Sequence, residues 1–198
     1  MKKISSNKIP DQLFVGNVLS AFTLAMTDKV NAAICKATGQ SESACYAIVQ
    51  IGTERNSSIE DLRRMLGLEH SSVVRLIDRL ERSGFARRER GASSDKRRVI
   101  INLTDEGENQ FTRILDARAK VIQKVIAQLS ASEMELLNGL VAKLMPAVAE
   151  CGDDQHVVCR LCDLEVCPQE RCPVNLAYPE NAEFPKNAFR RLKDSHFA

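Results

Sequence analysis

Two stretches of the sequence hold side chains whose types and spacing are suited to chemistry. The first, GFARRERGASSDKRRVIINLT at residues 84–104, is strongly basic and then turns apolar. Its acidic residues are Glu89 and Asp95. Its basic residues are Arg87, Arg88, Arg90, Lys96, Arg97 and Arg98. So many guanidinium and ammonium groups on one short segment favour binding to a polyanion, above all the phosphate backbone of a nucleic acid.

The second stretch is a run of cysteines near the C-terminus, spaced C-x2-C-x4-C-x4-C. Its members are Cys159, Cys162, Cys167 and Cys172. Thiolates at such intervals can converge as four tetrahedral metal ligands, so the spacing predicts a structural zinc (Zn) site. An iron–sulfur cluster, another redox use of the thiols and a metal-free tail stay open as alternatives. Cys151 and His156 lie just upstream and could substitute as ligands.

Composition limits the classes of protein to which the chain can belong. Its 198 residues suffice for one domain with an appendage, and 44% hydrophobic with 27% charged residues is typical of a globular protein. The net charge is only +2, so the distribution of charge matters more than its sum. From Ser71 to Arg98 there are nine Arg or Lys and four Asp or Glu, a local excess of five positive charges.

The N-terminus resembles a secretory signal only loosely. Pro10, Asp11 and Gln12 separate the basic start from the apolar residues, which recur at helical spacing, so we expect no signal peptide. We also expect no membrane span, because no run reaches about 18 apolar residues. The chain is then expected to be cytoplasmic, with its seven cysteines serving as thiols or metal ligands rather than in disulfides.

Helical patterns precede the basic stretch. Residues 11–38 are predicted to form one long amphipathic helix closed by Gly39. Ser41 caps a second helix that ends near Gly52. Ser58 then begins a short helix with an imperfect capping box, and Gly67 breaks it.

The next helix, residues 70–84, has two different faces. Its apolar stripe is Val73, Leu76, Ile77 and Leu80. A second stripe is Ser72, Arg75, Arg79 and Arg82. The first should face a core and the second should face solvent or a ligand. Ser71 and Ser72 are short enough to let the N-terminal end of the helix approach a phosphate.

After this helix the sequence predicts a basic β-hairpin and two more helices. Val99, Ile101 and Leu103 alternate as one buried strand face would, and GASSDK supplies the turn. Thr104 caps a helix, and Ser130 with Glu133 begins another. About 45 residues of helix with an apolar stripe exceed what so small a domain can cover, so we expect a second copy of the chain to cover them.

The predicted fold is mainly α (α+β), a winged helix-turn-helix between long dimerisation helices. The expected parts are 1–40, an N-terminal dimerisation helix; 41–104, the winged helix-turn-helix; 105–150, C-terminal dimerisation helices; and 151–198, a small Cys-rich extension. The second helix of such a pair enters the major groove of DNA, and the wing follows the backbone. The residues predicted to contact DNA are Ser71, Ser72, Arg75, Arg79, Arg87, Arg88, Arg90, Lys96, Arg97 and Arg98.

At these residues the sequence resembles the MarR family of bacterial winged-helix regulators. The matching pattern runs from SIEDLRRMLGLEHSSVVRLIDRLERSGFARRER to SDKRRVIINLTDEG, and the resemblance covers roughly residues 11–149. Its most specific part is Asp95-x-Arg97, followed by an apolar strand and Leu103-Thr104-x-x-Gly107. The Cys-rich extension departs from the family, whose typical members end near the last long helix.

The resemblance implies a homodimer that binds a pseudo-palindromic operator in double-stranded DNA, often as a repressor. It also implies that Arg97 is the minor-groove residue at the tip of the wing and that Asp95 holds it by a salt bridge. A small molecule, a metal or a redox change would be the signal. We expect no enzyme, because no catalytic arrangement of Ser, His and Asp and no Gly-rich phosphate loop is present. A metal- or thiol-dependent enzyme, or a protein-interaction module using the Cys-rich tail, is the alternative.

Overall fold

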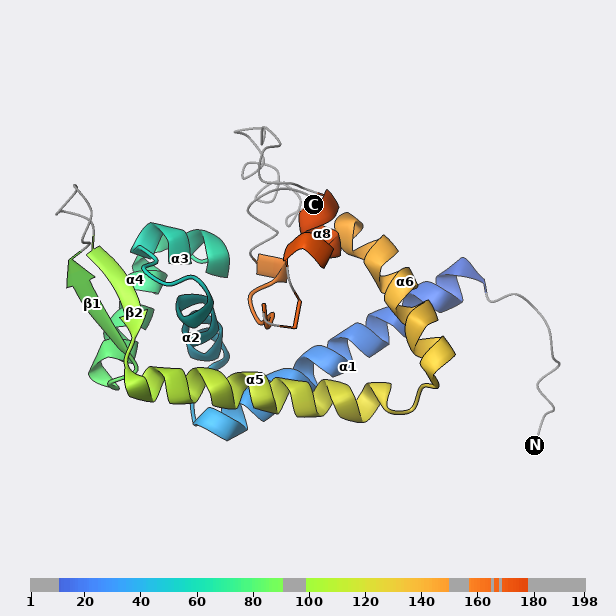
Figure 1. Cartoon of the computed structure of the whole chain (residues 1–198), viewed down its shortest axis with the longest axis horizontal. Helices are drawn as coiled ribbons and strands as arrows, with labels where there is room; N and C mark the ends of the chain where they lie inside the picture. The colour runs from blue at the N-terminus through green and yellow to red at the C-terminus, as the bar shows by residue number, and fades with distance from the viewer. Residues whose placement is uncertain (1–10, 91–98, 150–156, 165, 168, 178–198) are drawn as a thin grey trace.

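The computed structural model describes residues 11–90, 99–149, 157–164, 166–167 and 169–177. Seven α-helices, one 3-10 helix and one antiparallel hairpin follow one another in this part of the chain (Figure 1). They are α1 (Gln12–Thr38), α2 (Glu42–Thr53), α3 (Ile59–Leu66), α4 (His70–Arg82), β1 (Ala86–Arg90), β2 (Val99–Leu103), α5 (Asp105–Ile126), α6 (Ala131–Val148), η1 (Gln169–Arg171) and α8 (Pro173–Ala177). The predicted fold class is confirmed.

The helix boundaries lie where the sequence places capping residues. Ser41 Oγ accepts a hydrogen bond from the Ala44 N–H at the start of α2. At α3 the capping box is complete, because Ser58 Oγ accepts from the Asp61 N–H while the Asp61 carboxylate accepts from the Ser58 N–H. A second complete box at Ser130 begins α6. The local sequence therefore stabilises these helix starts through hydrogen bonds that span only three residues.

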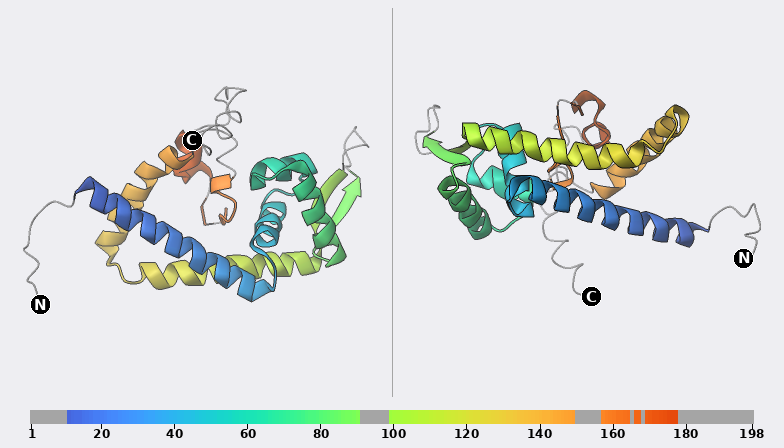
Figure 2. Two further views of the ribbon diagram at one scale, coloured as in Figure 1. Left: turned by 180° about the vertical axis from the view of Figure 1, so that it is seen from behind. Right: turned by 90° about the horizontal axis from the view of Figure 1, so that it is seen from below.

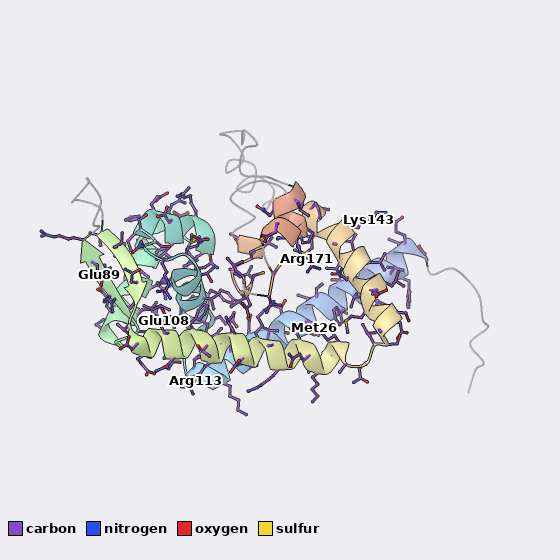
Figure 3. The ribbon with its side chains drawn as sticks, viewed as in Figure 1. Met26, Glu89, Glu108, Arg113, Lys143 and Arg171 are labelled. Atoms are coloured by element: carbon purple, nitrogen blue, oxygen red, sulfur yellow. The ribbon has the colours of Figure 1, made fainter. Side chains whose placement is uncertain are left out.

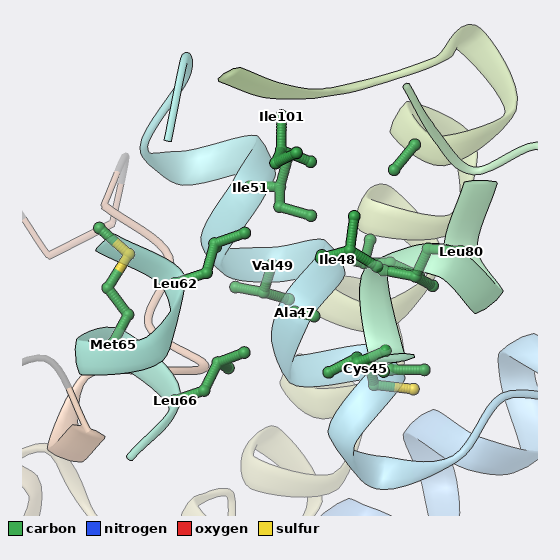
Figure 4. Packing of buried hydrophobic residues seen from close by; sticks show 14 of the residues in the cluster. Cys45, Ala47, Ile48, Val49, Ile51, Leu62, Met65, Leu66, Leu80 and Ile101 are labelled. Atoms are coloured by element: carbon green, nitrogen blue, oxygen red, sulfur yellow. The ribbon is translucent and has the colours of Figure 1, made fainter. Parts of the chain in front are cut away.

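The core lies in the unit formed by α2, α3, α4, the hairpin and the first half of α5 (Figure 4). Ile48 and Ile51 of α2 lie at its centre, with Leu62 of α3, Leu80 of α4 and Ile101 of β2 packed around them. Each of these side chains is at most 1% exposed. Burying such a side chain contributes about 1.5–3 kcal/mol, so this unit is stabilised by its own apolar contacts.

The end of the hairpin formed by Ala86, Ile101 and Leu103 packs into this core. Ala86 pairs with Leu103 and Arg90 with Val99, and Ile101 also donates its N–H to the carbonyl of Ser57. Ile101 and Leu103 are buried as predicted. Val99 is not, with 43% of its surface exposed, because it lies beyond the core toward the tip of the hairpin. The expected alternation therefore holds for the two residues nearest the core.

Two long helices extend from the core and carry α6 at their far end. The C-terminal part of α1 packs along α5, and Val30 and Ile34 of α1 are buried there (Figure 2). The N-terminal half of α1 and the whole of α6 keep their apolar side chains exposed. The exposed residues are Leu13, Phe14, Val15, Val18, Leu19, Phe22, Leu24, Leu136, Leu137, Leu140, Val141, Leu144 and Val148.

The sequence predicts no membrane span, yet α1 meets the length and composition of one. In the described part of the chain it is the one helix long and apolar enough to cross a membrane, by length and composition alone. A helix whose apolar residues are covered by protein passes the same test. Here its C-terminal end is already covered by α2 and α5.

One glycine is required where β2 meets α5. A Cβ on Gly107 would lie 2.0 Å from the carbonyl oxygen of Phe85 and 3.1 Å from Cβ of Leu103. The backbone approach is close because Thr104 caps α5 and also donates from its hydroxyl to the carbonyl of Gly84. The glycine of the Leu-Thr-x-x-Gly motif therefore fits the strand-to-helix junction closely.

We expect Gly107→Ala to lower the free energy of unfolding by about 1–3 kcal/mol, because the added methyl group overlaps backbone that cannot move freely. Urea denaturation at a fixed protein concentration measures the change. Gly139→Ala in α6 is the matched control, since nothing lies within 4 Å of its new Cβ and alanine favours a helix. Equal stabilities of the two variants would contradict the close packing at Gly107.

Candidate nucleic-acid interface

Helix α4 presents its basic stripe to solvent because its apolar stripe is buried. Val73, Leu76, Ile77 and Leu80 are each at most 2% exposed. They belong to the hydrophobic core, and α4 as a whole contacts α2, α3 and β1. The opposite side of the helix carries the predicted exposed residues Ser71, Ser72, Arg75, Arg79 and Arg82. The two faces that the sequence predicts are both confirmed.

The start of α4 is open. Its N-cap residue, Glu69, makes no side-chain hydrogen bond to the helix, although its carbonyl accepts from the Ser72 and Val73 N–H groups. No acidic residue stands in the first turn of α4. Ser71 and Ser72 therefore lie exposed at the positive end of the helix dipole, where an anion is favoured.

The hairpin carries basic side chains beside α4. Arg87 and Arg90 on β1 are exposed. Arg87 forms an ion pair with Glu89. Hydrogen bonds from Asn102 and then from Arg87 hold the pKa of Glu89 below its usual range, so this carboxylate stays ionised. The described strands of the wing therefore present mixed rather than purely positive charge.

Arg88 has a different position from its neighbours. Its guanidinium pairs with Asp78 at 2.7 Å and with Glu81, both on α4, and its backbone N–H donates to Glu81 at 2.9 Å. Its side chain is 31% exposed. The prediction that Arg88 lies on DNA is not supported by these contacts. They hold β1 against α4 instead, because two carboxylates of the recognition helix meet one guanidinium of the wing.

Four residues of the predicted interface lie outside the described residues. They are Asp95, Lys96, Arg97 and Arg98, which precede β2 in the sequence. The expected Asp95–Arg97 salt bridge is therefore a prediction that rests on the sequence.

The structure adds a supporting residue that sequence reasoning missed. Asn102 on β2 accepts from the Asn56 N–H at 2.9 Å and donates to Glu89 at 2.9 Å. It thus ties the turn before α3 to both strands of the wing. In the sequence Asn102 has the position of an ordinary surface residue on the solvent side of a strand. Its partner is the backbone of Asn56, which has a positive φ of 64°, and the sequence does not predict that turn.

The Cys-rich segment lies between the core unit and α6 (Figure 1). Cys159, Cys162, Cys167 and Cys172 are all half-buried. Cys159 shares a hydrogen bond with Cys162, and Cys167 shares one with Cys172. The four thiols therefore form two pairs. Among the described residues, no three His, Cys, Asp or Glu side chains are close enough together to hold a metal ion in this conformation. Cys151 and His156 lie outside the described residues.

The thiols of the first pair differ in acidity. A hydrogen bond from Cys159 lowers the pKa of Cys162 to about 7, helped by the positive charge of Arg118 on α5, against the effect of burial. The same hydrogen bond and burial raise the pKa of Cys159. By contrast, burial raises the pKa of Cys45, in α2, to about 11. Cys45 is therefore an apolar core residue, while Cys35 is half-buried.

Known proteins match this chain over the same elements. A sequence model of the MarR family matches residues 38–98, from the end of α1 to the wing. The transcriptional repressor MprA of Escherichia coli K12 is 26% identical over 125 residues, which are 62% of this chain and 70% of MprA.

Over residues 38–98 the chain has the sequence pattern of the MarR family.

Solved structures of MarR-family type share the fold. The YusO protein of Bacillus subtilis has a TM-score of 0.60 at 22% identity, covering 71% of this chain and 99% of YusO. Apo MarR of Escherichia coli has a TM-score of 0.55 at 20% identity, covering 71% of this chain and all of MarR (100%). The chain is thus a MarR-type DNA-binding regulator, and proteins of this family are in general transcription factors rather than enzymes.

Arg88 and Arg90 lie two residues apart on β1 and allow the two roles of wing arginines to be separated. We expect Arg88→Ala to lower the free energy of unfolding by about 1 kcal/mol, because Asp78 and Glu81 lose their partner. The salt dependence of DNA binding should stay the same. Arg90→Ala should change stability by less than about 0.5 kcal/mol and should reduce the salt slope by about 1.

Urea denaturation and DNA titrations at several salt concentrations measure both quantities. A reduced salt slope for Arg88→Ala, with unchanged stability, would show that Arg88 contacts DNA rather than α4.

Proposed function

We propose that the protein is a dimeric repressor that acts in the cytoplasm and binds a pseudo-palindromic operator in double-stranded DNA. The observation that carries the proposal is the pair of faces on α4. The face with Arg75 and Arg79 stays exposed while the opposite face is buried. A helix held in this way can enter a major groove with its basic side leading.

Arg75 and Arg79 are the residues that we place on the DNA first. They lie one turn apart on α4, and neither forms an ion pair with a residue that the structure describes. A free guanidinium can grip a phosphate or make two hydrogen bonds to a guanine edge. Arg82, in the last turn, donates to the carbonyl of Asp78 at 3.2 Å and is therefore less available.

The wing supplies backbone contacts beside α4. Arg87 and Arg90 extend from β1, and Lys96, Arg97 and Arg98 follow in the sequence before β2. In the proposed complex Arg97 enters the minor groove, where a narrow groove concentrates negative potential. Displacement of counterions by these cations would supply much of the affinity.

The exposed apolar side chains on α1 and α6 support a homodimer. A monomer in water rarely leaves so many large apolar residues uncovered, and here they gather on two helices at the end away from the wing (Figure 3, where Lys143 marks α6 and Glu89 the wing). A second copy related by a twofold axis would cover them and would present two α4 helices to one DNA duplex. Half-sites about 34–36 Å apart would match this arrangement.

Repression is proposed from the relative MprA, whose name describes a transcriptional repressor. A dimer that occupies an operator would exclude the transcription machinery from the same DNA. The signal that releases the repressor is a small molecule, a metal or a redox change. A groove lined by Cys35, Tyr46, Leu66, Val157 and Arg160 lies between the core unit and the Cys-rich segment, where a small-molecule effector would contact both.

The first test of this function is operator binding. We expect Arg97→Ala to weaken binding to the operator by about 1–3 kcal/mol, because one groove contact is lost. Genomic footprinting identifies the operator, and fluorescence anisotropy with that DNA gives the affinity. Lys124→Ala is the control, because Lys124 is exposed in the last turn of α5. Affinity that does not depend on salt would refute the phosphate contacts.

The second test is oligomeric state. We expect Leu140→Asp to convert the dimer to a monomer, because it places a charge among the exposed apolar residues of α6. Light scattering after size-exclusion chromatography gives the mass. Glu135→Ala, on the opposite side of α6, should remain a dimer. A Leu140→Asp dimer, or wild-type protein recovered with the membrane fraction, would rule out this interface.

A further inference from the structure

We propose that Cys159, Cys162, Cys167 and Cys172 bind one Zn²⁺ ion, and that this ion connects α6 to the DNA-binding unit. The effect on DNA rests on the function proposed above, whereas metal binding stands on the segment itself.

The first half of the segment is attached to the DNA-binding unit. Leu161 packs against its hydrophobic core, and the guanidinium of Arg160 lies over the ring of Tyr46 in α2, 4.9 Å from the ring centre. Val157 lies against Gly67, the residue that links α3 to α4: a Cβ on Gly67 would be 3.3 Å from a methyl group of Val157. Cys159 and Cys162 are therefore held beside α2 and the helix-turn-helix.

The second half is attached to α6. Helix α8 begins at Pro173, directly after Cys172, and the Leu176 N–H donates to the carbonyl of Cys172 at 2.9 Å. Val174 is completely buried, and α8 packs against α6 (Figure 1). Proline suits the first position of a helix, so this attachment begins at the last cysteine itself. Cys172 is thus tied to the helix that carries the exposed apolar face.

The thiols are arranged as two neighbouring pairs. A tight turn, in which the Cys162 N–H donates to the Cys159 carbonyl at 2.8 Å, brings the first pair together, and a second turn, in which the Cys167 N–H donates to the Asp163 carbonyl at 2.9 Å, leads from the first pair to Cys167. Cys159 lies within electrostatic range of both Cys167 and Cys172. Bringing the pairs onto one ion requires the two pairs to move toward each other.

The surroundings suit a thiolate metal site. Arg118 of α5 lies within electrostatic range of Cys162 and Cys167, and its positive charge would offset the negative charge that four thiolates leave around one Zn²⁺. Four soft sulfur ligands select zinc or iron over hard cations, and zinc accepts them in a closed tetrahedron with Zn–S bonds of about 2.3 Å. Each thiol gives its proton to solvent as it binds.

The ion would act as a crosslink between two parts of the molecule. One cysteine pair moves with α2 and the turn before α4, and the other moves with α6. In the dimer α6 carries the partner copy, so the crosslink fixes the distance between the two α4 helices. A dimer whose reading helices are already spaced for one duplex binds with less ordering cost. The zinc-loaded protein is therefore the form that binds the operator tightly.

Elemental analysis of the full-length protein, purified without added metal, tests the site. We expect one zinc per chain and neither iron nor labile sulfide. Replacement of the zinc by Co²⁺ should give the absorption of a tetrahedral thiolate site. Cys167→Ser and Cys172→Ser should lose the metal, whereas Cys35→Ser, outside the segment, should keep it. Thermal melting of each variant, and chelation of the wild type, separate loss of metal from loss of fold.

Three results would overturn the site: iron with labile sulfide, which indicates a cluster; two disulfides; or four titratable thiols without metal.

Operator binding tests the coupling. We expect removal of zinc from the wild type by a chelator to weaken operator binding between about 5- and 150-fold, and added Zn²⁺ to restore it. Cys167→Ser should bind weakly with or without Zn²⁺. A full complement of zinc whose removal leaves the affinity unchanged would overturn the coupling alone. Protein that holds zinc but binds no duplex DNA would refute the proposed function and leave the metal site in place.

Discussion

The burial of one side of α4 is the constraint on which the rest of the structure depends. Val73, Leu76, Ile77 and Leu80 are removed from water, and each such side chain contributes about 1.5–3 kcal/mol. Because the apolar stripe must face the core, Arg75 and Arg79 cannot turn away from solvent. The direction of the basic face is thus determined by apolar burial, and no interaction with DNA is needed to set it.

The wing is oriented by charge in addition to packing. Ile101 and Leu103 anchor the base of the hairpin in the core, while Arg88 pairs with Asp78 and Glu81 on α4. This contact offsets one of the two negative charges of these carboxylates, so they would repel a phosphate less in the proposed complex. The pairing thus accounts for acidic residues on a helix that is proposed to contact DNA.

Local signals in the sequence predicted the elements well, because caps act over three or four residues. Ser58 with Asp61, Ser130 with Glu133 and the αL glycines set boundaries that hold in the structure. The roles of Arg88 and Asn102 were not predictable in this way. Their partners lie 10 and 46 residues away, and a basic strand residue with an unknown partner resembles a DNA contact.

The contacts of the Cys-rich segment were likewise not predictable from local sequence signals. Its spacing predicted a ligand set, yet nothing in C-x2-C-x4-C-x4-C says against which helices the segment packs. The structure places its two ends on different parts of the molecule, since Arg160 stacks on Tyr46 and α8 packs on α6. A site that contacted one part alone could stabilise only that part. In the proposed dimer, a metal site that joined the helix-turn-helix unit to α6 could change the spacing of the two DNA-binding helices, which is the property that a regulator requires of a sensor.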